Sequence, residues 1–146
     1  MDFNTFLIRF GLDPNNFVNA FVDPIITPTG FIYELVQKAD IRICPHCNSN
    51  KAYVNDYDII EIGCSYNDHI EEKLRIKRVR FKCSKCHRTF TPDLVGITPH
   101  CQITEVQRKL ITADFTRKLT FAQIADKYHL SSSRIIQLFD TLVPYV

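Results

Sequence analysis

The chain has 146 residues, of which 45% are hydrophobic and 23% are charged, and it contains six Cys and no Trp. A chain of this length can bury roughly two thirds of its unfolded surface, so it predicts one domain or two small modules and excludes a long disordered tail. No apolar stretch approaches the roughly 20 residues of a membrane span, and the first residues lack the features of a secretory signal. The sequence therefore predicts a cytoplasmic protein with no membrane partner.

The net charge of +2 conceals an uneven distribution. Residues 1–40 hold two basic and five acidic side chains, residues 41–90 hold ten and six, and residues 91–146 hold six and five. Such a basic middle segment is typical either of a solvated strand face or of a surface for a polyanion. Its densest part has no acidic residue between the cations Lys73, Arg75, Lys77, Arg78, Arg80, Lys82, Lys85 and Arg88.

The first 40 residues predict a small α+β cap. Asp2 can cap a helix whose apolar stripe runs over residues 3–10 and ends at Gly11. Residues 17–22 and 31–36 are predicted to be two strands joined by a turn-rich segment. Six of the eleven Phe lie in this part, which favours an aromatic core, although an exposed Phe patch for a partner is the alternative.

Two cysteine pairs, at 44–47 and 83–86, flank the middle of the chain. A two-residue spacer directs both thiolates of a turn at one ion, and two such turns supply four sulfurs at about 2.3 Å in a tetrahedron. Each turn needs a left-handed residue after its second Cys, and Asn48 and His87 stand there. The pattern predicts one structural zinc ion, the only cofactor, held by Cys44, Cys47, Cys83 and Cys86.

Other interpretations of the cysteines are weaker. A thioredoxin-like redox site needs one pair near a βαβ pattern, which is not found around either pair. His46 and His87 are alternative ligands, but each adjoins a better placed thiol. Cys64 and Cys101 have no partner nearby in sequence and are predicted to be small buried apolar residues, with a reactive surface thiol as the alternative.

Between the cysteine pairs the pattern predicts short antiparallel strands. Residues 53–55 and 58–64 flank a predicted turn at 55–56. From residue 73 onward apolar and basic residues alternate until the phase slips at 77–78, where we predict a β-bulge that returns the later apolar residues to one face. Residues 41–92 are thus predicted to form a four-cysteine zinc ribbon, with a face that can contact phosphate formed by Lys73, Arg75, Lys77, Arg78, Arg80 and Lys82.

From Thr104 the hydrophobic period changes to that of helices. A capping-box pattern begins a helix over 104–117, and a second begins a shorter helix at Thr120. A third helix starts at Ser131 or Ser132 and ends near Pro144. Residues 102–146 are therefore predicted to be a three-helix domain.

The last two helices match a helix-turn-helix, with His129 in place of the usual Gly of the turn. The third helix would then enter the major groove of double-stranded DNA, where Arg pairs with guanine and Gln with adenine. Its predicted DNA-contacting residues are Ser132, Ser133, Arg134 and Gln137. A structural three-helix bundle without a ligand is the alternative.

The order of these parts resembles the amino-terminal region of ISL-three-type insertion-sequence transposases. The resemblance covers nearly the whole chain, and its most specific marks are the four pair cysteines and residues 77–81. It implies a zinc finger plus helix-turn-helix that recognises terminal inverted repeats, and a ribonuclease-H-like catalytic domain that follows. This chain ends at Val146, before that domain, so we expect no catalytic residue and no small-molecule substrate.

The sequence thus predicts an α+β protein with three parts: a cap at 1–40, the ribbon at 41–92 and the helices at 102–146. Two further hypotheses remain open. In one, the ribbon and the Phe-rich cap form an interaction or homodimerisation module. In the other, the chain is a stand-alone zinc-dependent transcription regulator.

Overall fold

The computed structural model describes residues 2–20, 23–40, 43–64, 70–98 and 103–142, which form a mixed α+β structure. Residues 21–22 of the first predicted strand, Cys101 and Pro144 lie outside the described residues. The elements follow in the order α1 (Phe3–Arg9), η1 (Pro14–Asn16), β1 (Ile25–Ile26), β2 (Gly30–Val36), β3 (Ala52–Gly63), β4 (Glu71–Cys83), β5 (Thr89–Phe90), β6 (Ile97–Thr98), β7 (Ile103–Thr104), α2 (Glu105–Asp114), α3 (Phe121–Tyr128) and α4 (Ser132–Leu142).

The N-terminal helix confirms its sequence prediction. The Asp2 carboxylate accepts a hydrogen bond from the Thr5 backbone N–H at 2.7 Å, which satisfies one of the free donors of the first turn. Gly11 follows the helix with a φ of +73°, a conformation that glycine adopts without strain. The buried side of α1 lies against the sheet and contributes aromatic rings to the main apolar cluster, so the predicted aromatic core is correct.

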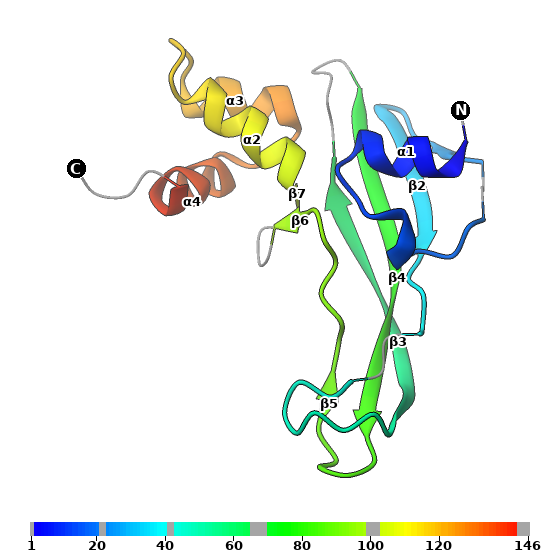
Figure 1. Cartoon of the computed structure of the whole chain (residues 1–146). Helices are drawn as coiled ribbons and strands as arrows, with labels where there is room; N and C mark the ends of the chain where they lie inside the picture. The colour runs from blue at the N-terminus through cyan, green and yellow to red at the C-terminus, as the bar shows by residue number, and fades with distance from the viewer. Residues whose placement is uncertain (1, 21–22, 41–42, 65–69, 99–102, 143–146) are drawn as a thin grey trace.

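Strand β4 is the centre of the sheet (Figure 1). It pairs antiparallel with β3 along nearly its whole length and parallel with β2 over Glu71–Lys77. Beyond the end of β2, the short β5 takes over the same edge of β4. The remaining strands extend the order to β1-β2-β4-β3-β7-β6, so the N-terminal segment and the long hairpin share one sheet.

Strand β4 crosses the predicted bulge site without interruption, so that prediction is wrong. Lys77 pairs with Ile59 and Arg78 with Asp58 in unbroken register. The apolar phase slips because β4 buries opposite faces in its two halves: Ile76 packs under α1, whereas Val79 packs in a separate cluster beside β5. The burial requirement that suggested a bulge is met by two small cores on opposite faces.

The irregularity lies on the neighbouring strand instead. The register of β3 shifts between Val54 and Asp56, which leaves Asn55 as the extra residue. The shift moves Val54 to the face of Phe81, so β3 follows the change of face in β4. The turn predicted at 55–56 is therefore this bulge within one continuous strand.

The prediction of a first strand in the cap is also wrong for its described residues, 17–20. Phe17 forms only an isolated bridge with Gln37, and the strand that pairs with β2 is β1, beyond the predicted range. Phe17 is fully buried and serves the core without belonging to a strand. The predicted strand at 31–36 is confirmed as β2.

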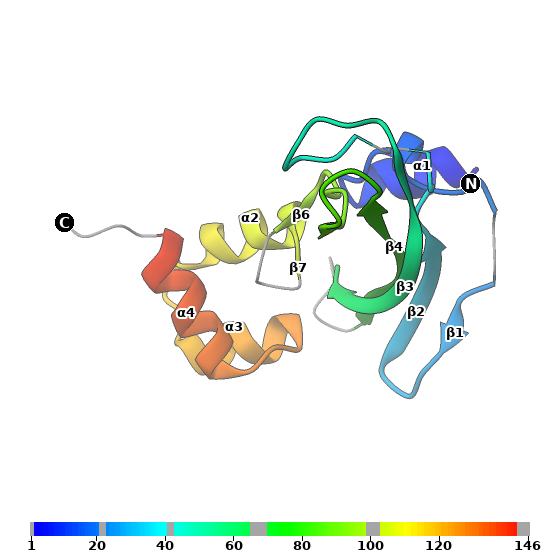
Figure 2. The ribbon, with the colours of Figure 1, turned by 90° about the horizontal axis from the view of Figure 1, so that it is seen from below.

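The three C-terminal helices form their own apolar cluster and gather beside the sheet (Figure 2). Strand β7 connects them to the sheet through a single parallel pair, Gly63 with Ile103. Ile103 is buried in the helical cluster, so this short strand joins the two parts. None of the described helices has the length and apolar character needed to cross a membrane.

Candidate metal centre and nucleic-acid interface

The two cysteine pairs form turns with the same backbone geometry. The Asn48 N–H donates to the Cys44 carbonyl at 2.8 Å, and the His87 N–H donates to the Cys83 carbonyl at 2.9 Å. Asn48 and His87 have φ values of 58° and 61°, the left-handed conformation predicted for the residue after each pair. Each turn therefore curls back so that both of its sulfurs face the same point.

The long hairpin brings the two turns together. Ala52, just after the first turn, pairs with Cys83 at the end of β4. The Ser84 hydroxyl and backbone N–H also donate to the Lys51 carbonyl, at 2.6 and 3.1 Å. The strand register thus determines that residues far apart in sequence share one site.

The four sulfurs form a cluster that can hold a metal ion. All four lie within 4.8 Å of one another, and Cys44–Cys86 and Cys47–Cys83 are separated by 3.6 and 3.5 Å. A tetrahedron of thiolates at about 2.3 Å from an ion has sulfur–sulfur distances of about 3.8 Å. The donor set therefore fits a tetrahedral metal site with no rearrangement of the backbone.

The environment of the sulfurs favours a thiolate at one position in particular. The backbone N–H groups of Cys86 and Lys85 lower the pKa of Cys83 to about 6. At Cys47 the hydrogen bond from the Ser49 N–H is outweighed by burial and by the neighbouring sulfurs, which raise the pKa to about 11. A bound cation would stabilise all four thiolates, so the cluster gains from a metal ion.

The six predicted phosphate contacts lie on β4, but on opposite faces. Lys73, Arg75 and Lys77 point away from α1, since Leu74 and Ile76 between them are buried under it. After the change of apolar face, the cations Arg78, Arg80 and Lys82 point to the other side. The expectation of a single basic face on this strand is therefore wrong.

Four of these six cations also have acidic partners. Glu71 and Glu61 lie 3.1 and 3.0 Å from Lys73 and Arg75. On the other face, Asp58 and Asp56 lie 2.6 and 2.9 Å from Arg78 and Arg80.

Three of these acidic partners lie on β3, and Glu71 lies on β4 itself. The run of cations at 73–88 contains no acids because all four partners precede it in the chain. Lys77 instead stacks over the Tyr57 ring, with its Nζ 4.7 Å from the centroid. Four of the six cations of β4 thus have acidic partners, three of them across the ladder on β3.

Helices α3 and α4 are joined by a tight turn. Thr120 and Gln123 form the predicted capping box, with reciprocal bonds of 2.8 and 3.1 Å. His129 ends α3 at a φ of 58°, and the Leu130 N–H donates to the Ala125 carbonyl at 2.9 Å. The turn conformation expected of Gly is therefore adopted by His129.

The four predicted groove contacts lie in the first turns of α4, and they differ in exposure. Ser132, Ser133 and Gln137 are exposed, while Ile135 and Leu138 on the opposite side are buried in the helical cluster. Arg134 is half-buried and lines a pocket between the helices and the sheet. The exposed side of α4 therefore offers hydroxyl and amide groups, together with the apolar Ile136 and, toward the C-terminal end, the Asp140 carboxylate.

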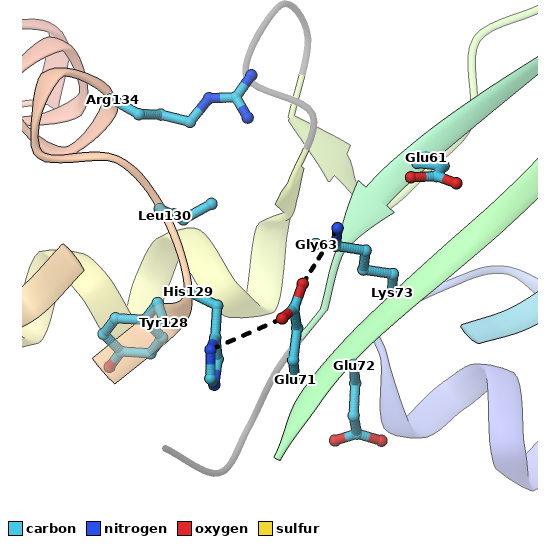
Figure 3. Close-up of a pocket in the computed structure, with 9 residues that line it drawn as sticks. All are labelled: Glu61, Gly63, Glu71, Glu72, Lys73, Tyr128, His129, Leu130 and Arg134. Carbon is cyan, nitrogen blue, oxygen red and sulfur yellow. Dashed lines mark ion pairs between the residues drawn. The ribbon is translucent and has the colours of Figure 1, made fainter. Parts of the chain in front are cut away.

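The pocket lies where the turn after α3 approaches the start of β4 (Figure 3). Glu71 lies between the two parts, with its carboxylate 3.1 Å from Lys73 Nζ and 3.8 Å from His129 Nδ1. Burial alone would raise the pKa of Glu71, but Lys73, Thr29 and His129 together hold it below its ordinary value. Sequence reasoning missed this contact, because nothing local relates residues 71 and 129.

Comparison with known proteins adds no relative to this description. No protein-family model, curated protein or solved structure matches the chain at a significant level. The function therefore has to be argued from the metal site and the helices themselves.

Proposed function

We propose that this chain is a zinc-stabilised module that binds double-stranded DNA in a sequence-specific manner. The observation that supports this most directly is the pair α3–α4, with a tight left-handed turn and an exposed polar N-terminal face on α4. A helix-turn-helix places such a second helix in the major groove. Ser133 and Gln137 are four residues apart and so lie on the same face of the helix, as base-reading side chains must.

Zinc is the metal that we propose for the cysteine cluster. Four thiolates in a tetrahedron are typical of structural zinc sites, whereas magnesium and calcium prefer oxygen ligands. Cys44, Cys47, Cys83 and Cys86 would hold the ion, and its binding energy would stabilise the end of the β3–β4 hairpin. The ion is structural in this proposal and takes part in no reaction.

The resemblance to ISL-three-type transposases leads us to propose terminal inverted repeats as the DNA target. A stand-alone transcription regulator would use the same module on another target. Selection of bound duplexes from a random pool distinguishes these proposals, because it yields the recognised sequence itself. If the selected duplex binds no more tightly than random duplex at matched salt, sequence-specific recognition is refuted.

A protein-interaction module is the second candidate. The sheet face opposite α1 carries exposed apolar side chains, with Ile59 at 65%, Tyr57 at 47% and Val36 at 42% exposure. The Ile59 side chain lies in one cross-strand row with Val36 and Lys77. Sedimentation over a range of concentrations tests a homodimer on this face, and a monomer at every concentration argues against it.

A further inference from the structure

We propose that the metal end of the protein is its principal contact with the DNA backbone, through a surface that we call the knuckle tip. This inference rests on the proposed DNA-binding function and specifies where phosphate is bound. The knuckle tip is formed by four cations around the two cysteine turns, Lys51, Lys82, Lys85 and Arg88.

The knuckle tip, which includes Lys82 at the end of β4, carries the positive charge without acidic partners that the middle of β4 mostly lacks. Three of the four cations are exposed, namely Lys51, Lys85 and Arg88. None of the four, Lys82 included, forms an ion pair among the described residues. The chain has no Asp or Glu between residues 41 and 55 or between 73 and 92. A divalent ion with four thiolates is a net negative centre, and four cations more than offset it.

The backbone of the two turns holds these cations in a defined arrangement. Lys51 and Ser84 are joined by two hydrogen bonds, which places the neighbouring Lys85 beside Lys51. Lys82 pairs across the ladder with Thr89 and Tyr53. A shallow hollow between the turns is lined by Asn48, Ser49, Asn50, Lys51, Ser84 and Lys85, whose amide, hydroxyl and ammonium groups are suitable donors for phosphate oxygens.

The exposed face of α4 carries no exposed cation, so the proposed contact with the DNA backbone is sought elsewhere in the molecule. Ser132, Ser133 and Gln137 on the exposed face of α4 are neutral. Hydroxyl and amide groups can discriminate bases, but they supply little of the salt-dependent attraction that dominates affinity for DNA. A separate cationic surface that binds the backbone would provide it.

The spacing of the two surfaces suits one duplex. The turn after α3 lies at the Glu71 end of β4, whereas the cysteine turns lie at its Cys83 end (Figure 1). Thirteen strand residues at about 3.3 Å each separate the two ends by about 40 Å. One turn of B-DNA measures about 34 Å, so the knuckle tip would meet the backbone about one turn from the groove that α4 occupies.

The test compares the full zinc-loaded chain with its variant Lys51→Gln/Lys85→Gln/Arg88→Gln. Affinity is measured by fluorescence anisotropy over a range of salt concentrations, on the duplex selected from a random pool and on a random-sequence duplex. The slope of log K against log salt is negative, and each lost phosphate contact reduces its magnitude by about 0.9. The slope of the triple variant should therefore be smaller in magnitude than that of the parent by about 2.7 on both duplexes. Phosphate ethylation about one helical turn from the α4 contact should interfere with binding by the parent and not by the variant.

The matched control is Lys109→Gln, which removes an exposed lysine on α2 that belongs to neither the cysteine turns nor the exposed face of α4. It should keep the slope of the parent. Zinc content and the circular dichroism spectrum confirm that each protein is folded. If the parent binds the selected duplex and the triple variant keeps its salt slope, the knuckle-tip inference is wrong while the proposed function stands. If the parent binds neither duplex, both fail.

Discussion

Asp114 provides the sharpest test of how the helices are held together. This carboxylate at the end of α2 is only 2% exposed. It accepts hydrogen bonds from the Tyr128 hydroxyl at 2.6 Å and from Lys127 Nζ at 2.9 Å, both on α3, and Arg117 Nε lies 3.4 Å away. Burial would raise the pKa of Asp114, but the Tyr128 bond and the cations outweigh it and hold the pKa below its ordinary value of 3.8.

The expected cost of Asp114→Ala follows from these contacts. Losing the hydrogen bond between a carboxylate and a buried hydroxyl costs about 1.5–3 kcal/mol. The cations add at most about 1 kcal/mol, because the side chains of Lys127 and Arg117 are 31% and 65% exposed and remain solvated in the variant. We therefore expect a loss of about 2–4 kcal/mol in the unfolding free energy of the helices.

Urea unfolding followed by circular dichroism at 222 nm measures this loss. The matched control is Asp126→Ala, an exposed acid on α3, which should change stability by no more than about 0.5 kcal/mol. The double variant Asp114→Ala/Tyr128→Phe removes both partners of the Tyr128–Asp114 hydrogen bond and should cost less than the sum of the single changes. Equal losses in Asp114→Ala and Asp126→Ala would refute the reasoning.

The pH dependence provides an independent check on the same group. Since the folded pKa of Asp114 is depressed, its contribution is present above the unfolded pKa near 4 and is lost as the pH falls through the folded value. Stability of the parent should therefore fall below about pH 4 more steeply than that of Asp114→Ala.

The remaining predictions concern the metal, the turn and the groove. Cys83→Ser should abolish zinc binding and raise hydrogen exchange at the cysteine turns while the helices stay protected; collapse of the whole fold would contradict this. His129→Gly should stabilise the helices by up to about 1 kcal/mol in thermal unfolding, because Gly adopts the left-handed turn without strain, and a loss of stability would contradict it. Gln137→Ala should relax the sequence preference in a pool selection and leave affinity for random duplex unchanged; an unaltered preference would exclude Gln137 from base reading.

Local signals in the sequence predicted local structure well. The caps at Asp2 and Thr120 and the left-handed residues Asn48 and His87 are each determined by neighbours within a few positions, so the motif alone specifies the geometry. The buried state of Cys64 was also predicted correctly. The clustering of the four pair cysteines required one further assumption, that the two turns end a common hairpin, and the register of β3 and β4 meets it.

What the sequence did not reveal depends on contacts between distant segments. The alternation on β4 indicated a strand but not which face is buried, because α1 covers one half and β5 adjoins the other. Likewise the run of cations contains no acids, yet Asp58 and Glu61 on β3 neutralise two of them from across the ladder. The parallel pairing of β2 with β4 has no local signal at all, since it joins segments separated by the whole of β3.

The neutralised middle of β4 has a consequence for how DNA would be bound. Cross-strand ion pairs such as Arg78–Asp58 and Arg80–Asp56 contribute about 0.2–1 kcal/mol each to the hairpin and offer little net charge to a phosphate. Binding such an arginine to DNA would require breaking its pair, which offsets part of the gain. The β3–β4 hairpin then acts as a spacer between two ends that each present polar groups to a ligand. The length of β4 sets the separation of those ends at about one turn of DNA, and the cross-strand acids would confine phosphate binding to the ends, since without them the whole of β4 would compete for the backbone.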